Sequence, residues 1–443
     1  MKKLLKALAL TMSLLMVVSM STSALAQDSR ETITFWFSMG SRNGDAIQAL
    51  VKAYNESQDK YFVDAQYQGS YDDALAKLKS TPEGLRPDVI QLYEVGSLWM
   101  INSDYYIPVQ QYIDAEKFDT SDYQDNVLAY YKIGGKLNSM PFNSSVPAVS
   151  YNVEALEKAG VKPEDLNTLD GVLEASRKIV AAGAARYGAC LDNDAWLFEQ
   201  YIAMQGSFLT DADNGRSGVA TKLAIDENGA GLNLLNIWRN FATDPSTVTY
   251  GSGGGGTAEA KKEFSAGNVA IFISTCGNFR DLLDGAAGSF TVAQRPIPKL
   301  KAEDPYKVSI GGASLWVLNN GDQTQGDGAW DFIKFCAQPA MMAQWTYSTG
   351  YLPVSKAAEN EPLYQKYLEE NPGFALIMDE LHETTPASAG ALIGVTGKFR
   401  SIVQNEIQKL MGDPNYTCEE ALKSICDQTN EEIDMFNVSN GLI

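Results

Sequence analysis

The chain of 443 residues carries a formal charge of -20, from 35 Lys and Arg against 55 Asp and Glu, and 45% of its residues are hydrophobic. This balance indicates a globular protein of two or three folding units and excludes a disordered or collagen-like chain. So acidic a surface repels phosphate backbones and anionic lipids, which argues against nucleic-acid and membrane-surface partners.

His382 is the only histidine. Catalytic triads and two-histidine metal sites are therefore excluded, and we expect neither a metal nor a cofactor. A pair of carboxylates of the glycosidase type remains open, but 55 acidic residues produce such pairs by accident.

The N-terminus has the pattern of a cleaved secretory signal. Lys2 and Lys3 precede an apolar stretch over residues 4–20, and Ala24-Leu25-Ala26 forms a small-x-small cleavage pattern. A membrane anchor is the alternative, but polar residues interrupt the stretch. We expect removal of residues 1–26 with their three lysines, which takes the charge to -23, and export to a periplasm.

Five cysteines are present, an odd number in a chain too long to need disulfide bonds. Two of them are eight residues apart within one predicted helix, at about 12 Å, which is beyond the reach of a disulfide. We expect buried, reduced thiols at Cys190, Cys276, Cys336, Cys418 and Cys426.

Hydrophobic periodicity predicts strands that alternate with helices. After Asn43, a helix is marked by an apolar stripe of Ile47, Leu50, Val51 and Tyr54. Further helices are predicted over 72–80, 154–159 and 279–283, and strands over 33–37, 62–67, 88–93, 149–151 and 269–274. Such alternation is typical of parallel βαβ units, so we predict an α/β fold with a helical C-terminal part.

The run Gly251-Ser252-Gly253-Gly254-Gly255-Gly256 is the one low-complexity segment. It lacks the Gly-Lys-Ser/Thr ending of a phosphate-binding P-loop, so we interpret it as a flexible surface loop.

Arg400 stands out in the helix predicted after Gly394. Helical periodicity puts Phe399, Val403 and Leu410 on one apolar face and Arg400 beside it. One interpretation is an arginine whose stem covers the edge of the core. The other is a desolvated guanidinium that binds an anion with two parallel hydrogen bonds.

Several segments form a familiar set when they are taken together. They are Ser150-Tyr151-Asn152 with Leu156, Lys158-Ala159-Gly160 and Pro163, and Phe264-x-x-Gly267 with Ala270-Ile271. The set resembles the family-1 extracellular solute-binding proteins of ABC importers, and the resemblance covers essentially the whole mature chain.

The resemblance implies an α/β periplasmic binding protein fold of type II, in which each lobe is a mixed sheet flanked by helices and the ligand binds between the lobes. It implies a first lobe of residues 27–145 and 308–352 and a second lobe of 146–307 and 353–443. It also implies a monomeric carrier without enzymatic activity, whose partners are a small-molecule ligand and an inner-membrane ABC permease.

Five further blocks resemble the branch of this family that binds sn-glycerol-3-phosphate. In chain order they are Tyr67-Gln68-Gly69-Ser70-Tyr71, Tyr93-Glu94-Val95-Gly96, Pro141-Phe142-Asn143-Ser144-Ser145, Ile310-Gly311-Gly312-Ala313-Ser314-Leu315-Trp316-Val317 and Thr349-Gly350-Tyr351-Leu352-Pro353. The helix with Arg400 lies where that branch carries its ligand arginine.

This resemblance assigns a role to eight residues. The residues around the phosphate would be Tyr71, Ser145, Gly312, Tyr351 and Arg400. Glu94 would accept hydrogen bonds from the glycerol hydroxyls, Trp196 would pack on the carbon skeleton, and Thr275 would supply a hydroxyl in place of a serine-rich turn.

The residue types suit this chemistry. Arginine, hydroxyl and backbone N–H groups donate to phosphate oxygens, and an ionised Glu94 accepts from hydroxyls and repels phosphate. Each residue also has a structural interpretation: Ser145 as a turn cap, Tyr71 and Tyr351 as rim aromatics, Gly312 as a bend. Asn193 replaces a tryptophan of the branch, so a larger glycerophosphodiester or another phosphorylated polyol also fits.

Three alternatives remain open. A sugar-binding protein of an ABC importer would hold its ligand by aromatic stacking and carboxylates, with Trp36, Trp196 and Glu94 as candidates. A secreted glycosidase has only the acid count in its favour. A structural or adhesive surface protein would need repeats or an anchor, and neither is visible.

Overall fold

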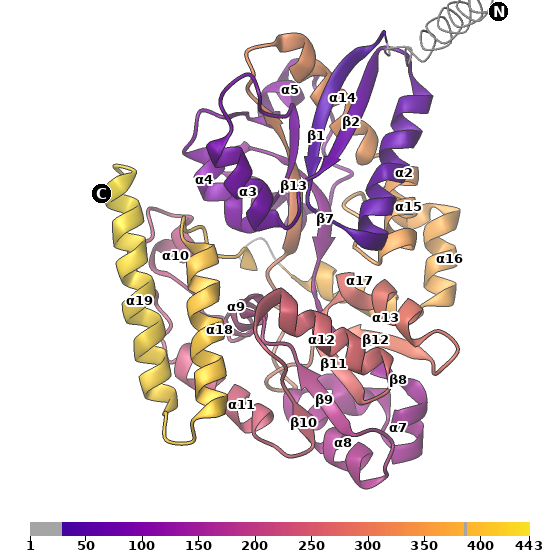
Figure 1. The fold of residues 1–443 in the computed structure, drawn as a ribbon, viewed down its shortest axis with the longest axis vertical. Coiled ribbons are helices and arrows are strands. Elements are labelled where there is room, and N and C mark those ends of the chain that lie inside the picture. Colours follow the sequence, from indigo (N-terminus) through magenta and orange to yellow (C-terminus); the bar gives the residue numbers. More distant parts are fainter. Residues whose placement is uncertain (1–28, 385–387) are drawn as a thin grey trace, which may run out of the picture.

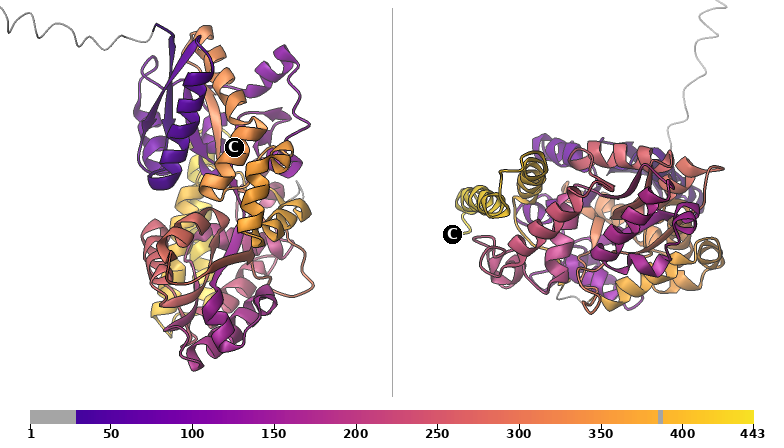
Figure 2. Two further views of the ribbon diagram at one scale, coloured as in Figure 1. Left: turned by 90° about the vertical axis from the view of Figure 1, so that its right-hand side faces the viewer. Right: turned by 90° about the horizontal axis from the view of Figure 1, so that it is seen from below.

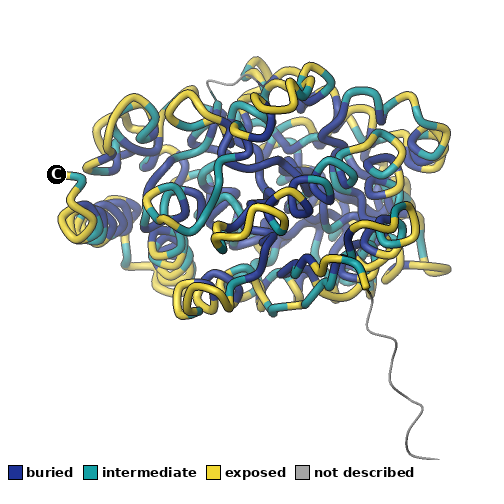
Figure 3. The backbone as a smooth tube through the Cα atoms, turned by 90° about the horizontal axis from the view of Figure 1, so that it is seen from above, coloured by how far each residue is buried: buried dark blue, intermediate teal, exposed yellow. Residues whose placement is uncertain are grey.

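The structure is a computed structural model and describes residues 29–384 and 388–443. The predicted signal at residues 1–26 lies outside the described residues. The chain forms two lobes, one above the other, each built around its own sheet (Figure 1). Turning the molecule by 90° keeps the lobes stacked (left of Figure 2), and buried residues run through the interior (Figure 3).

The first lobe holds a mixed sheet in the order β2-β1-β3-β13-β4, and β7 also pairs with β13. β1 is parallel to both β2 and β3, but β13 is antiparallel to β3, β4 and β7. The strands are β1 (Glu31–Phe37), β2 (Tyr61–Tyr67), β3 (Val89–Tyr93), β4 (Tyr106–Ile107), β7 (Met140–Ser145) and β13 (Gly311–Leu318).

Helices flank this sheet, and a small hairpin joins the lobe. The helices are α2 (Ser41–Ser57), α3 (Tyr71–Ser80), α4 (Ser97–Ile101), α5 (Val109–Glu116), α6 (Asp125–Tyr131), α14 (Gln323–Cys336) and α15 (Pro339–Thr349), with the short 3-10 helix η1 (Glu94–Gly96). The hairpin pairs β5 (Lys132–Ile133) with β6 (Lys136–Leu137).

The second lobe holds a mixed sheet in the order β10-β9-β11-β8-β12, in which β8 is antiparallel to β11 and β12. Its strands are β8 (Pro147–Asn152), β9 (Tyr187–Leu191), β10 (Thr247–Val248), β11 (Val269–Thr275) and β12 (Val292–Pro296). Its helices are α7 (Val153–Ala159), η2 (Pro163–Asn167), α8 (Leu169–Ala181), α9 (Ala195–Met204), α10 (Asp211–Gly215), α11 (Ala230–Ala242), α12 (Gly253–Ser265), η3 (Cys276–Asn278) and α13 (Phe279–Ala286).

The C-terminal part is helical, as predicted. It consists of η4 (Ala357–Asn360), α16 (Pro362–Glu370), α17 (Gly373–Glu383), α18 (Thr396–Gly412) and α19 (Cys418–Ser439). The long helices α18 and α19 lie side by side at one flank of the molecule (Figures 1 and 2). Among the described residues, no helix is long and apolar enough to cross a membrane.

Local sequence signals explain why several elements start and stop where they do. The stripe of Ile47, Leu50, Val51 and Tyr54 is buried along α2, as predicted. Helix α7 is capped at its start by Asn152, whose side chain accepts from Ala155 N, and at its end by Gly160, which has a left-handed φ of 65°.

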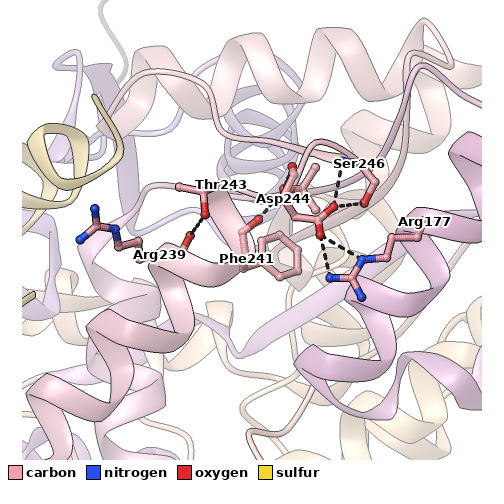
Figure 4. Close-up of polar contacts among 7 residues, drawn as sticks. Arg177, Arg239, Phe241, Thr243, Asp244 and Ser246 are labelled. Atoms are coloured by element: carbon pink, nitrogen blue, oxygen red, sulfur yellow. Dashed lines mark hydrogen bonds and ion pairs between the residues drawn. The ribbon is translucent and has the colours of Figure 1, made fainter. Parts of the chain in front are cut away.

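Side-chain hydrogen bonds also hold loops of the second lobe in place. Asp244, in the loop between α11 and β10, accepts from Nε and Nη2 of Arg177 on α8 at 3.0 and 2.8 Å, and from the backbone and hydroxyl of Ser246 (Figure 4). This corner ties α8 to the edge of the second sheet.

The structure corrects one prediction and confirms another. The glycine run is not a loop throughout, because Gly253–Gly256 form the first turn of α12. Ala260 and Phe264 anchor that helix in the core, and this packing offsets the cost of about 1 kcal/mol per glycine. All five cysteines are buried and unpaired, as expected.

Candidate functional site

A cavity of about 500 Å³ opens between the two lobes. Its first-lobe side includes Ser38, which follows β1, and Tyr71, the first residue of α3. Its second-lobe side is longer and includes Asp192, Asp194, Trp196, Thr257, Lys261 and Thr275. The volume lies in the range of small-molecule sites.

Arg400 is paired with two carboxylates. None of these three residues lines the cavity itself, but Asp194, which does, acts on the charge of Arg400. Its Nε and Nη2 donate to the two carboxylate oxygens of Glu199, at 2.6 and 3.2 Å. The same Nη2 lies 2.8 Å from Oε1 of Glu94. Only 15% of the Arg400 side chain is exposed, and 9 and 10% of the two glutamates. Arg400 is therefore no snorkelling residue, because its head group is buried and paired.

These three residues come from distant parts of the chain. Glu94 begins η1, directly after β3 of the first sheet, whereas Glu199 lies on α9 and Arg400 on α18. Helix α9 is capped by Asp194, whose carboxylate accepts from Trp196 N at 2.9 Å. Because Trp196 and Glu199 are three residues apart, they share a face of α9 that looks toward the cleft. The guanidinium thus connects the two lobes.

The pKa values in this cluster reflect burial and pairing. Burial opposes the charge of Arg400, but Glu199 and Glu94 more than offset it and raise the pKa of the guanidinium well above its usual range. Burial also raises the pKa of Glu199, although the charge of Arg400 acts in the opposite direction. Two carboxylates against one guanidinium leave the cluster with a charge of about -1 when all three groups are ionised.

A chain of buried hydrogen bonds sets the direction in which Tyr71 can donate. The backbone N–H of Ser38 donates to Gln91 Oε1 (3.0 Å), Gln91 Nε2 donates to Asn143 Oδ1 (2.7 Å), and Asn143 Nδ2 donates to the Tyr71 hydroxyl (3.1 Å). A backbone N–H can only donate, so it fixes the orientation of both amides in turn. The Tyr71 oxygen is an acceptor within the protein, and its hydrogen is left for the cavity.

The two cleft tyrosines are held in place by packing. The ring of Tyr71 stacks on Tyr93 at a centroid distance of 5.0 Å with an interplanar angle of 5°. Tyr351 lies against Gly277, where an added Cβ would come within 2.8 Å of its ring. Burial, and then the neighbouring Tyr351, raise the pKa of Tyr71, so its hydroxyl keeps its proton.

Trp196 and the start of β13 form a close contact. Trp196 is 7% exposed and lines the cavity, and an added Cβ at Gly311 would lie 2.5 Å from its ring. Gly312 has a φ of +112°, and a Cβ there would lie 1.8 Å from the backbone oxygen of Asn143. Glycine is therefore required at both positions for steric reasons.

The structure brings the eight predicted residues together to different degrees. Glu94 and Arg400 are in direct contact, and Tyr71, Trp196 and Thr275 line the cavity. Ser145 ends β7 and pairs in register with Gly311, next to Gly312 and close to Trp196. Tyr351 contributes to the pKa of Tyr71, as does Glu94.

Thr275 also has a structural role, because its hydroxyl accepts from Gly277 N at 3.3 Å and caps η3. Trp36, considered above for sugar stacking, is 4% exposed and belongs to a core cluster of the first lobe. Its ring is covered by Lys77 at 4.1 Å. This burial excludes Trp36 from stacking on a ligand.

Sequence reasoning missed Glu199 and Asn143, as well as five residues that line the cavity: Ser38, Asp192, Asp194, Thr257 and Lys261. Glu199 follows Trp196 at helical spacing, and that spacing was the available signal. Asn143 lies inside the block Pro141-Phe142-Asn143-Ser144-Ser145, but its role depends on Gln91, which is distant in sequence.

Comparisons with known proteins agree with this architecture. A family model described as "Bacterial extracellular solute-binding protein" matches residues 49–372. The sn-glycerol-3-phosphate-binding periplasmic protein UgpB of Yersinia enterocolitica is 30% identical over 405 residues, which cover 89% of this chain and 91% of that protein. UgpB of Escherichia coli is 28% identical over 418 residues, 92% and 94% of the two chains.

Solved structures with the same fold are type II periplasmic binding proteins. UgpB from Mycobacterium tuberculosis in complex with glycerophosphocholine superposes with a TM-score of 0.74 at 20% identity, over 93% of this chain and 100% of that one. The GacH receptor of Streptomyces glaucescens, solved unliganded and with acarbose, gives a TM-score of 0.75 at 20% identity, over 91% and 99%. The chain belongs to the bacterial extracellular solute-binding proteins and, like them, is a non-enzymatic carrier that delivers a small molecule to an ABC importer.

Proposed function

We propose that this solute-binding protein captures sn-glycerol-3-phosphate or a related glycerophosphodiester in the periplasm. The observation that carries the proposal is the paired fork of Arg400, which joins Glu94 of the first lobe to Glu199 of the second, together with the hydroxyl of Tyr71, which lines the interlobe cavity and on which Glu94 acts. The relatives named UgpB support the same ligand class.

The proposed ligand pose follows from donors and acceptors. The phosphoryl oxygens accept hydrogen bonds from Arg400, from the hydroxyls of Tyr71 and Tyr351 and from the backbone N–H at Gly312. The glycerol hydroxyls donate to Glu94, and the carbon skeleton packs on Trp196. Ser145 also donates its hydroxyl to the phosphoryl group, and Thr275 contributes a hydroxyl beside the ligand.

Closure of the lobes provides capture. We propose that residues 27–145 and 308–352 move as one lobe and 146–307 and 353–443 as the other, in line with the strands that each sheet contains. A ligand held by groups of both lobes stabilises the closed form only through contacts made in that form, and the permease recognises that form. The carrier acts as a monomer.

A neutral sugar is the second candidate. Four carboxylates lie in or next to the cleft: those of Glu94, Asp192, Asp194 and Glu199. Carboxylates accept hydrogen bonds from sugar hydroxyls, and Trp196 offers a face for stacking. A phosphate ester depends on the paired N–H groups of Arg400, whereas a neutral sugar does not.

Titration calorimetry with sn-glycerol-3-phosphate, glycerophosphocholine and maltose separates them. Arg400→Lys keeps the charge but loses the planar fork, and we expect it to weaken phosphate-ester binding at least tenfold, from loss of a charge-assisted bond of about 1.5–3 kcal/mol. Arg239→Lys is the matched control, since Arg239 donates to backbone carbonyls of Pro414 and Tyr416 away from the cleft. Binding of maltose alone, or unchanged phosphate-ester affinity in Arg400→Lys, would refute the proposal.

A further inference from the structure

Glu199 occupies the position on Arg400 that an anionic ligand needs. Its two oxygens accept from Nε and Nη2, the paired geometry in which arginine binds phosphate or carboxylate. Among the described residues, Arg400 is the one hydrogen-bond donor to the Glu199 carboxylate. A ligand that takes this edge of the guanidinium therefore leaves Glu199 without a partner.

Among the described residues, Arg400 is the cation that acts most strongly on Glu199, whereas Arg216 lies over the ring of Tyr130 and Lys261 of the cavity pairs with Asp281 at 2.7 Å. The charged groups that act on it are Arg400 from α18, Glu94 from η1 and Asp194 at the start of α9. Tyr130 of α6 also faces the cluster, and burial raises the pKa of its phenol, so it is uncharged. Two of the three charged neighbours are acids, and a buried, unpaired carboxylate is strongly unfavourable.

We propose that Glu199 is a built-in competitor of the ligand, which leaves the fork of Arg400 and takes up one proton from solvent when an anionic ligand binds. This inference rests on the proposed function, because a neutral sugar would not need to displace Glu199. The proton neutralises the released carboxylate, so the charge of the cluster rises by one as the ligand's negative charge arrives. Burial already favours the neutral form of Glu199.

The sign of the pH dependence follows from linkage. In the unliganded protein Glu199 is ionised at pH values above its pKa, and binding consumes a proton as long as the pH stays below the higher pKa that Glu199 has in the complex. The dissociation constant consequently rises with pH, by up to about tenfold per pH unit in this range. Below that pKa Glu199 is already protonated, and the affinity no longer changes with pH.

Calorimetry of glycerophosphocholine binding tests this coupling. A phosphodiester has no titratable phosphate proton near neutrality, unlike sn-glycerol-3-phosphate, whose own second ionisation falls near pH 6. Titrations between pH 6 and 8.5, each in two buffers with different ionisation enthalpies, count the protons exchanged. For the wild type we expect an uptake that approaches one proton per ligand between the pKa of Glu199 in the unliganded protein and its pKa in the complex.

Two variants and a control test whether Glu199 is the group that takes up the proton. Glu199→Gln should bind without proton uptake, with an affinity independent of pH and higher than that of the wild type at pH 8.5. Glu199→Asp keeps the acid and should keep the uptake. Glu406→Gln removes a buried carboxylate of α18 that bonds to Tyr416 and Ser424, and it should behave as the wild type does.

The outcomes separate this inference from the proposed function. Binding by the wild type without proton uptake would mean that the ligand uses Nη1 and leaves Glu199 in place, and it would overturn the inference alone. Uptake that persists in Glu199→Gln would do the same. Failure of the wild type to bind any phosphate ester would overturn both.

Discussion

The hydrogen-bond chain behind Tyr71 makes a directional prediction that two substitutions at one position can test. Asn143 donates to the Tyr71 hydroxyl at 3.1 Å and accepts from Gln91. In Asn143→Asp, which has nearly the same shape, a carboxylate still accepts from Gln91 but can no longer donate. The Tyr71 hydrogen then turns toward the new carboxylate, and the cavity faces a lone pair in place of a donor.

The magnitude follows from the geometry. A ligand oxygen bonded to Tyr71 would lie roughly 5 Å from the new charge, given 3.1 Å to Asn143, about 2.7 Å for an O–H···O bond and a roughly tetrahedral angle at the hydroxyl oxygen. Repulsion of two unit charges at that distance is about 3 kcal/mol at an effective dielectric constant near 20. Loss of the donated bond adds about 1.5 kcal/mol or more, so the phosphate-ester affinity should fall about a thousandfold.

Asn143→Ala removes the amide without reversing the hydroxyl, and it should weaken binding only about tenfold. The affinity of Asn143→Asp should recover at low pH, because the protonated carboxyl again donates to Tyr71. Calorimetry from pH 5 to 8.5 measures both effects. Asn437→Asp, a buried asparagine that donates to Ala220 O far from the cleft, controls for lost stability. Equal losses in the Ala and Asp variants at pH 8 would refute the directional argument.

Two further predictions concern stability and lobe contact. Glu380 is completely buried, and burial raises its pKa well above the usual range, although the backbone N–H of Ile297 acts in the opposite direction. The folded protein thus retains a proton that the unfolded chain releases, and stability should fall by up to about 1.4 kcal/mol per pH unit as the pH rises from about 4.3 toward the raised pKa. Glu380→Gln should remove this slope in urea unfolding measured from pH 5 to 8, and an unchanged slope would contradict it. Arg42 of α2 pairs with Asp284 of α13 across the cleft, and both side chains are partly exposed. Because exposed ion pairs are weak, Arg42→Ala should speed ligand release less than about fivefold in stopped-flow measurements. At high salt the difference between the variant and the wild type should disappear.

Local sequence patterns predicted those elements whose signals are themselves local. The stripe from Ile47 to Tyr54 and the cap and stop of α7 were sufficient for their helices. The glycine run was misjudged because its helix depends on contacts of Ala260 and Phe264 with the rest of the lobe. Periodicity alone also predicted parallel βαβ units. It could not show that β13 inserts between β3 and β4 as an antiparallel strand, because that pairing joins segments more than 200 residues apart.

The site shows the same division. Resemblance to the family pointed to Arg400 and Glu94, and the structure puts them in contact. Glu199 is one acid among 55 in the sequence. Its role as the partner of Arg400 becomes visible only when α18 packs against α9. The orientation of Tyr71 is likewise a product of three long-range hydrogen bonds, which no local pattern reports.

The glycines at the start of β13 bear on how this carrier can change its ligand over evolution. Any side chain at Gly311 would strike Trp196, and any at Gly312 would strike the backbone of Asn143. Substitution at these two glycines is therefore closed as a route to a new ligand, and Trp196 is held in place by the same contact. A change of specificity is more accessible at Asp192 and Asp194, whose carboxylates line the cavity and which a single substitution can replace.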